Sequence, residues 1–261
     1  GLTVTPHVYS SVLPMLQVDY SALNDKGAFR VTGYATESRR SDDLLTQTPT
    51  DTRRAFRGYL DGIELFDHEL FKMPFDEACN TDPQLRKLLE VVWSAIQDAG
   101  YTLASFRERQ TGVFVATKGH SGYHESNPAA RLHRPEMLSA YANRLSNIFN
   151  LAGPSEAIET GCSGFLVAVK HAMEAIARGR CKQAIVATAE LSLSRSELDM
   201  ADSLGMYSKQ RATRSFARDS DGYVRSEAIG AIVIKPLELA REDGDQNYLT
   251  VRGVGVCHGG K

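Results

Sequence analysis

The sequence predicts an α/β fold in which helices cover both faces of one sheet. Strand-like runs such as 183–192 and 228–237 are apolar almost throughout, which is typical of strands buried on both faces. Segments with helical periodicity separate these runs. The 261 residues are 42% hydrophobic and 24% charged, which is the composition of an ordinary globular protein. We therefore expect one large domain or two small ones.

The N-terminal part of the chain has the weakest pattern. Over residues 1–55, apolar residues are scattered among polar, turn-rich stretches such as "ATESRRSDD" and "TQTPTDTRR". We predict a divergent or irregular N-terminal arm over 1–55. Residues 56–261 contain no internal linker and are predicted to form one unit.

Regular elements are predicted throughout the second part. The helix at 83–99 is the best marked, because Asp82 is a preferred N-cap residue, Pro83 suits the first helical position and Gly100 suits the end. The other predicted helices are 136–150, 162–178 and a short one at 238–244, and the predicted strands are 111–117, 156–160, 183–192, 228–237 and 248–257.

Charge and cysteine usage exclude several classes of function. The net charge of −2 and pI near 6.4 lack the basic excess of nucleic-acid or anionic-membrane binding proteins. No run approaches the roughly 18 apolar residues of a membrane span, and residues 1–20 do not resemble a signal peptide, so we expect a cytoplasmic protein. The cysteines show neither CxxC nor Cys/His ligand spacing, so we expect reduced thiols and no metal: Cys79, Cys162, Cys181 and Cys257.

Cys162 lies where a predicted strand meets a predicted helix. Gly161 permits a tight turn, and the helix would begin near Cys162. Backbone N–H groups and the positive end of the helix dipole favour a thiolate there and suit an oxyanion. The alternative, a small buried side chain in a turn, is what most free cysteines are.

A cysteine nucleophile normally works with a base, and the histidines are the candidates. His171 is nine residues further on, so it points to the opposite helix face, about 13 Å along the axis. His120 and His124 lie in a predicted loop, and His258 follows the last predicted strand. The sequence alone pairs none of them with Cys162. The segment 209–227, rich in Arg and Asp, is either a solvated loop or an ordered, ion-paired one.

Several stretches together carry a specific resemblance. "GPSEAIETGCSGFLVAVKHAMEAIARG" resembles the active-site segment of β-ketoacyl synthases, above all ketosynthase domains of modular polyketide synthases. "DPQLRKLLE", "ANRLSNIFNLAGPS" and "SFARDSDGYVRSEAIG" resemble neighbouring family segments, in order and at family spacing over about 56–261. The motifs "DGYVR" and "HGGK" most resemble those of synthases that use a free-standing acyltransferase, the trans-acyltransferase type.

The resemblance implies a thiolase-like fold of layered αβαβα type, of which this chain supplies mainly the N-terminal half. It implies that Cys162 accepts an acyl chain from the phosphopantetheine of an acyl carrier protein, for decarboxylative Claisen condensation with a malonyl extender. It also implies a homodimer and no bound cofactor or metal. The family takes two histidines, a lysine and a second oxyanion donor from its C-terminal half, whose motifs do not occur here.

Two further expectations follow from this resemblance. Gly161, Gly164 and Phe165 replace the residues of the common TACSSS motif, and we expect these replacements to reshape the acyl pocket. Apolar residues surround most of helix 162–178, so we expect a companion C-terminal half or chain to cover it. The alternative functions are a non-elongating domain that holds or transfers an acyl chain, or supports an assembly, and an unrelated cysteine acyl-hydrolase.

Overall fold

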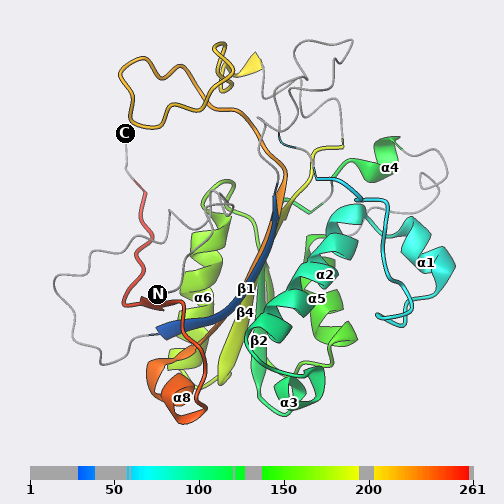
Figure 1. Cartoon of the computed structure of the whole chain (residues 1–261), viewed down its shortest axis with the longest axis vertical. Coiled ribbons are helices and arrows are strands. Elements are labelled where there is room, and N and C mark those ends of the chain that lie inside the picture. The colour runs from blue at the N-terminus through cyan, green and yellow to red at the C-terminus, as the bar shows by residue number, and fades with distance from the viewer. Residues whose placement is uncertain are drawn as a thin grey trace.

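The centre of the protein is a mixed sheet. The computed structural model describes residues 29–38, 58, 60–119, 121–126, 137–193 and 203–258. Its six strands lie in the order β3-β2-β4-β5-β1-β6 (Figure 1). In chain order they are β1 (Phe29–Ser38), β2 (Thr111–Ala116), β3 (Ser155–Ile158), β4 (Gln183–Glu190), β5 (Ala228–Pro236) and β6 (Leu249–Val251).

Strand direction decides which loops meet. β2 pairs in parallel with β3 and β4, so the carboxyl ends of these three strands reach one edge of the sheet. β5 is antiparallel to β4, with Ala228 opposite Glu190, so the start of β5 lies at that same edge. We call this edge the site edge. The end of β5 and the following helix lie at the opposite edge.

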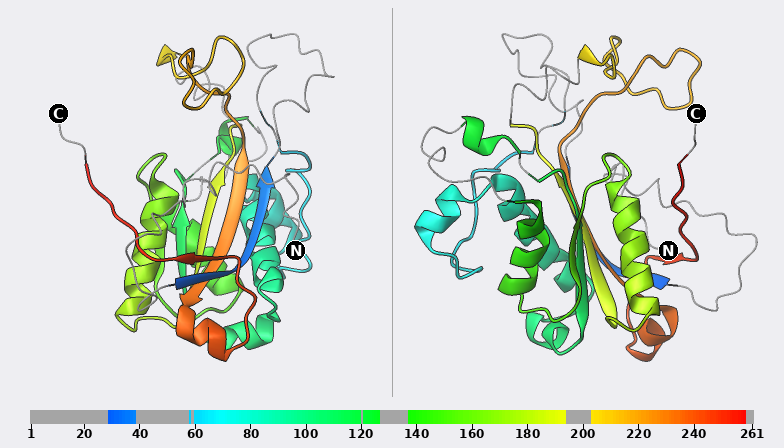
Figure 2. Two further views of the ribbon diagram at one scale, coloured as in Figure 1. Left: turned by 60° about the vertical axis from the view of Figure 1, so that its left-hand side comes forward. Right: turned by 180° about the vertical axis from the view of Figure 1, so that it is seen from behind.

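Helices cover both faces of the sheet, as predicted. Val113 and Val115 of β2 pack into one core with α2 and α5, whereas Phe114 and Ala116 pack into a second core with α6. Figure 2 shows these helices on opposite sides of the sheet. The helices are α1 (Phe75–Asn80), α2 (Pro83–Asp98), α3 (Leu103–Arg107), α4 (Tyr123–Ser126), α5 (Leu138–Ile148), α6 (Gly164–Ala177) and α8 (Leu237–Glu242).

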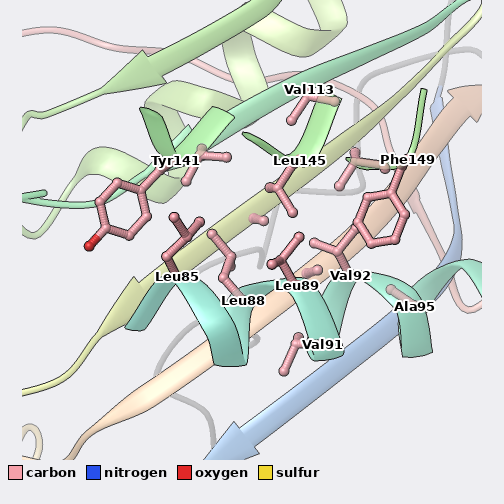
Figure 3. Packing of buried hydrophobic residues seen from close by; sticks show 14 of the residues in the cluster. Leu85, Leu88, Leu89, Val91, Val92, Ala95, Val113, Tyr141, Leu145 and Phe149 are labelled. Atoms are coloured by element: carbon pink, nitrogen blue, oxygen red, sulfur yellow. The ribbon is translucent and has the colours of Figure 1, made fainter. Parts of the chain in front are cut away.

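The predicted helix at 83–99 is confirmed as α2. Asp82 caps it by accepting a hydrogen bond from the backbone N–H of Gln84 at 2.8 Å, and Pro83 occupies the first turn. Leu85, Leu88 and Leu89 are fully buried and face α5 and the sheet (Figure 3). Burying each leucine contributes about 1.5–3 kcal/mol, so this stripe fixes α2 on the sheet.

The structure differs from the sequence-based predictions at two strands. Residues 29–38, placed in an irregular arm, form β1, which pairs with β5 and β6. A register shift between Val31 and Gly33 breaks the alternation by which a strand is recognised in sequence. The rest of 1–55 lies outside the described residues. The last strand, predicted over 248–257, is only the three-residue β6.

The surface of α6 differs from the expectation as well. Its apolar residues pack on the sheet, but Lys170 and His171 are half-buried; Lys170 forms an ion pair with Glu174, and His171 Nδ1 lies 3.1 Å from Glu156 Oε2. One side of the helix is therefore polar. The apolar pattern of α6 alone does not require a covering partner.

A buried cation joins elements at the edge opposite the site edge. The side chain of Lys235, at the end of β5, is 0% exposed. Its Nζ donates to Asp243 Oδ2 at 2.5 Å, Asp245 Oδ2 at 2.6 Å and Tyr101 Oη at 2.7 Å. Arg109 adds a bidentate pair to Asp243 at 2.6 and 3.1 Å. This cluster joins β5, the turn after α8 and the loops on both sides of α3.

Charge pairing sets the protonation of the cluster. Burial alone lowers the pKa of Lys235, but its bonds to Asp243, Asp245 and Tyr101 raise the pKa above its ordinary value. The bond from Arg109, followed by that from Lys235, holds the pKa of Asp243 below its ordinary value. The stabilisation of the folded state by Asp243 is therefore lost as pH falls through its lowered pKa. The stabilisation by Lys235 is lost as pH rises through its raised pKa.

We expect Lys235→Met to lower the free energy of unfolding by about 3–5 kcal/mol, because two carboxylates lose their buried cation. We also expect the wild-type stability to be highest between roughly pH 4 and 10 and the variant to lose the decline on the alkaline side. Urea denaturation across this pH range measures both effects. The exposed Lys182→Met is the control and should change stability by less than about 0.5 kcal/mol. Equal stability of the Lys235 variant and this control would contradict the prediction.

Candidate active site at the carboxyl edge of the parallel strands

Cys162 lies in a tight turn between β3 and α6. Gly161 has a left-handed φ of 57°, which favours glycine, and its carbonyl accepts the N–H of Gly164 at 3.0 Å. The helix begins at Gly164 instead of the predicted position near Cys162, because this turn separates strand and helix. Cys162 is exposed and precedes the N-cap residue Ser163. It is therefore presented at the surface and is not a buried packing residue.

The start of α6 is left open toward Cys162. Ser163 makes no side-chain hydrogen bond to the first-turn N–H groups. Its Oγ donates instead to the backbone oxygen of Thr160 at 2.8 Å. A helix start carries partial positive charge on its backbone N–H groups, so the turn offers an electropositive surrounding to an anion.

Gly164 fixes the position of this helix start. A Cβ at Gly164 would lie 3.2 Å from the Cβ of Ala116, the last residue of β2. The first turn of α6 therefore packs closely on the end of β2. The family motif has serine at this position, and its replacement by Gly164 was predicted to affect the acyl pocket. In the structure the glycine lies at the close contact between α6 and β2.

Ionised side chains from the neighbouring strand ends meet beside this turn. Glu190, the last residue of β4, accepts hydrogen bonds from Lys118 Nζ at 2.9 Å and from Arg225 Nη2. Lys118 follows β2 and Arg225 precedes β5. Burial lowers the pKa of Arg225, but its bond to Tyr207, together with the charge of Glu190, raises it above the ordinary value. Glu190 thus holds three neighbouring loops at the site edge.

Tyr223 brings the segment 203–225 within electrostatic range of Cys162. Burial raises the pKa of Tyr223, and the neighbouring Tyr207 and Cys162 raise it further. The rings of Tyr207 and Tyr223 lie edge to face at 5.5 Å, and the Nη1 of Arg225 donates to Tyr207 Oη at 3.4 Å. Arg225 therefore links Glu190 to this pair of tyrosines.

The segment 203–225 is also ordered internally. Asp221 accepts hydrogen bonds from Ser208 Oγ at 2.6 Å and from the backbone N–H of Lys209 at 3.0 Å. These bonds, the one from Ser208 first, lower the pKa of Asp221. Arg214 pairs with Asp219. Of the two alternatives for this stretch, the structure shows the ordered, ion-paired loop.

A buried side-chain amide forms hydrogen bonds with two loops of the site edge. Gln84, near the start of α2, donates to Thr117 Oγ1 at 3.0 Å and to the backbone oxygen of Gly119 at 3.1 Å. Its Oε1 accepts the N–H of Leu191 at 2.8 Å. Gln84 therefore ties together the loops that carry Lys118 and Glu190. We assigned no role to Gln84 from the sequence, although it lies in the family-like segment "DPQLRKLLE". Its only signal in the sequence is a polar residue beside the apolar stripe of a helix.

The described histidines have partners elsewhere. His171 Nδ1 lies 3.1 Å from Glu156 Oε2 of β3. His124 is buried, and its Nε2 lies 3.2 Å from the backbone oxygen of Asn80. His258 is exposed, and His120 lies outside the described residues.

The other cysteines differ from Cys162 in position. Cys181 is buried, and burial raises the pKa of its thiol, as expected for a packing residue. Cys79 and Cys257 are exposed but do not lie at the start of a helix. Within the described ranges, no three His, Cys, Asp or Glu side chains are placed to hold a metal ion. No described helix is long and apolar enough to span a membrane.

Together, an α/β/α arrangement and an exposed cysteine between a parallel strand and a helix fit the N-terminal half of a thiolase-like fold. The sequence matches the family described as "Beta-ketoacyl synthase, N-terminal domain" over residues 26–240. The chain belongs to this family, and the predicted ketosynthase resemblance is confirmed. The match begins before β1, so the family region extends further toward the N-terminus than residue 56.

Individual relatives are polyketide synthases. The chain is 41% identical to polyketide synthase ThaG of Burkholderia thailandensis over 84% of this chain and 4% of ThaG. It is 40% identical to polyketide synthase PksR of Bacillus subtilis over 78% of this chain and 8% of PksR. The chain thus spans a small fraction of the curated relatives it matches.

Solved ketosynthase domains share the fold. The oxazolomycin ketosynthase domain OzmH KS7 of Streptomyces albus superposes with a TM-score of 0.73 at 29% identity, over 84% of this chain and 45% of that chain. The ketosynthase from module 6 of the bacillaene synthase of Bacillus subtilis gives 0.73 at 27% identity, over 85% and 42%. These similarities confirm the predicted thiolase-like fold.

We expect Glu190→Gln to loosen the segment 203–225, because Lys118 and Arg225 lose their shared counter-charge. The loss of about 1 kcal/mol of local stability should speed amide hydrogen exchange over 206–225 by roughly fivefold. Hydrogen-exchange mass spectrometry measures this. Glu238→Gln, which removes an exposed pair with Arg241 on α8, is the control. Unchanged exchange over 206–225 in the Glu190 variant would show that this pairing does not hold the segment.

Proposed function

We propose that this chain is the part of a polyketide ketosynthase that accepts an acyl chain as a thioester on Cys162. One observation carries the proposal: Cys162 is exposed in the turn directly before the start of α6, a position where the partial positive charge of a helix start favours a thiolate. The residues around it that match the family's active-site segment support the same role. The enzyme class is acyltransferase of the β-ketoacyl synthase type.

The acyl transfer follows from this geometry. The Cys162 thiolate attacks the carbonyl carbon of an acyl thioester carried on the phosphopantetheine of an acyl carrier protein. The negative charge that develops on the carbonyl oxygen is stabilised by backbone N–H groups of the turn, that of Cys162 among them. When the tetrahedral intermediate collapses, the carbon–sulfur bond to the carrier breaks. The carrier leaves as a thiol and takes up a proton, and the acyl group remains on Cys162.

Condensation needs groups beyond this chain. In the family, histidines of the C-terminal half assist decarboxylation of a malonyl extender, whose carbanion then attacks the Cys162 thioester in a Claisen condensation. The motifs of that half do not occur in the 261 residues. We therefore propose that a companion C-terminal half completes the site, and that the acyl donor belongs to a synthase with a free-standing acyltransferase.

A non-elongating role is the second candidate. The described histidines His124 and His171 are engaged with Asn80 and Glu156, and this favours an acyl-holding or transferring domain when no companion half is present. We place either activity in the cytoplasm, where free thiols such as the four cysteines stay reduced.

Intact mass after incubation with an acyl N-acetylcysteamine thioester tests acyl transfer to Cys162. We expect one acyl adduct on the wild type and none on Cys162→Ala, because this substitution removes the attacking sulfur. Cys79→Ala and Cys257→Ala remove the other exposed thiols and should keep the adduct. A wild type without an adduct, or an adduct that survives in Cys162→Ala, would overturn both candidate functions.

We also propose a homodimer formed through the free edge of β3. Among the described strands β3 ends the sheet and pairs only with β2, so its other side presents backbone donors and acceptors. Two such edges pair across a two-fold axis without further elements. Light scattering at several concentrations should give about twice the 28.7 kDa chain mass. A mass that stays at one chain up to high micromolar concentrations would contradict a dimer.

A further inference from the structure

Glu227 is a buried carboxyl group at the site edge, one residue before β5. The residue is 4% exposed. Its Oε2 accepts the backbone N–H of Leu60 at 2.9 Å, and its Oε1 accepts that of Ser192 at 3.0 Å. Leu60 lies in the segment before α1, and Ser192 lies two residues after the end of β4. One side chain thus joins three segments that are far apart in the sequence.

Backbone hydrogen bonds fix the position of Glu227. The N–H of Gly58 donates to the oxygen of Arg225 at 3.1 Å, and the N–H of Glu227 donates to the oxygen of Gly58 at 2.8 Å. These bonds form a parallel bridge between Gly58 and Ser226. The main chain therefore holds the carboxyl group between its two N–H donors whatever its charge. A change of charge must be met by the hydrogen bonds of the carboxyl group itself.

The hydroxyl group of Ser192 is the second part of this arrangement. Ser192 is 7% exposed, and its Oγ is buried without a hydrogen-bond partner in the part of the chain that the structure describes. Ser121 offers a comparison, because its N–H and its Oγ both donate to the carboxylate of Asp82, at 2.9 and 2.8 Å. At Glu227, only the N–H of the serine is bonded. A serine hydroxyl can also accept, and rotation about χ1 brings it to the group that its own N–H binds.

The surroundings of Glu227 favour its neutral form. Burial raises the pKa of Glu227 above its ordinary value, and the bonds from Leu60 and Ser192 and the charge of Arg225 offset this only in part. The charge of Glu190 raises the pKa further. Glu227 therefore takes up a proton closer to neutral pH than an exposed glutamate does. The charged side chains on the described segments around it are Asp61, Lys118, Glu190 and Arg225.

We propose that Glu227 and Ser192 form a proton-operated switch in the support of the site edge. As a carboxylate, Glu227 accepts the N–H groups of Leu60 and Ser192. A proton from solvent then binds Oε1, which donates it to Ser192 Oγ, while Oε2 continues to accept the N–H of Leu60. Oε1 is the oxygen that takes the proton, because an O–H at Oε2 would face the N–H of Leu60. The N–H of Ser192 loses its acceptor.

The switch acts on the loop that begins at Glu190. The N–H groups of the three residues after Glu190 are all bonded, and that of Ser192 is the middle one. They donate to Gln84 Oε1, to Glu227 Oε1 and to the backbone oxygen of Ser121. Loss of the middle bond loosens this loop, and Glu190 is the residue that binds Arg225. Protonation of Glu227 therefore weakens the attachment of the segment 203–225.

Carbon-13 NMR of labelled glutamate carboxyl groups between about pH 4 and 8 tests the switch. The resonance of Glu227 is assigned by its absence in Glu227→Gln or Glu227→Asp. We expect Ser192→Ala to lower the pKa of Glu227, so that its acid dissociation constant rises about three- to tenfold. The reason is that the acid form loses its acceptor while the carboxylate keeps both N–H bonds. Ser94→Ala, which removes an exposed hydroxyl on α2, is the control and should change nothing.

An unchanged pKa of Glu227 in Ser192→Ala overturns the proposal, because the hydroxyl then does not bind the carboxyl group. A higher pKa overturns it as well, because the hydroxyl then donates to the carboxylate, as Ser121 does to Asp82.

Hydrogen exchange in Glu227→Gln gives a second measurement. The amide offers one acceptor and one donating group, so it imitates the protonated acid. At neutral pH we expect the N–H of Ser192 to exchange at least about fivefold faster than in the wild type, with the N–H of Leu60 still protected. Faster exchange at both positions, or at neither, would contradict the switch.

The switch goes beyond the proposed function and does not depend on it. A protein that forms no acyl adduct on Cys162 loses the proposed function, whereas the effect of Ser192→Ala on Glu227 stays the same. An unchanged pKa of Glu227 in Ser192→Ala removes the switch and leaves acyl transfer to Cys162 as it was.

Discussion

The hydrogen bonds of one buried amide, Gln84, hold the site edge together. Its two N–H groups and its oxygen bind the loop after β2 and the loop after β4, and Tyr141 Oη lies 3.3 Å from the same nitrogen. Asp82, two residues earlier, accepts from both the N–H and the hydroxyl of Ser121 at 2.9 and 2.8 Å. Hydrogen bonds thus join the start of α2 to two of the loops at the site edge. An unsatisfied buried amide would cost about 1–3 kcal/mol, so detaching either loop from Gln84 destabilises the fold.

The two edges of the sheet carry opposite kinds of charge arrangement. At the far edge, the buried Lys235 is surrounded by carboxylates and a phenol, and this cluster closes the fold. At the site edge, Glu190 is 37% exposed and binds two cations from loops that face solvent. The first arrangement suits permanent structure. The second keeps the segment 203–225 in place at the site edge while leaving the exposed Cys162 accessible to other molecules.

Sequence reasoning succeeded where the signals were local. The cap at Asp82, the apolar stripe of α2 and the buried strands β2, β4 and β5 all have signatures within a few residues. β1 was missed because its alternation is broken at Val31 and Gly33 and its pairing partner lies about 200 residues away in β5. Cys162 was proposed from the helix-start pattern and the family resemblance together; its exposed position before α6 is confirmed, and its role as nucleophile stays a prediction.

The rest of the site could not be predicted from spacing. Glu190 meets Arg225 because β4 and β5 pair with Ala228 opposite Glu190, which is a matter of register. Lys118 joins them because β2 lies beside β4 in parallel. These features follow from contacts that exist only after the sheet has formed.

The position of β5 has a consequence for synthesis on the ribosome. β5 lies between β4 and β1, its first residues adjoin Arg225 and its last residue but one is Lys235. β1 leaves the ribosome early but has no hydrogen-bonded place in the sheet until β5 emerges about 200 residues later. The turn that carries Cys162 is complete in sequence well before that moment. Glu190 can bind Lys118 before that moment, but its pair with Arg225 forms only when this late strand arrives.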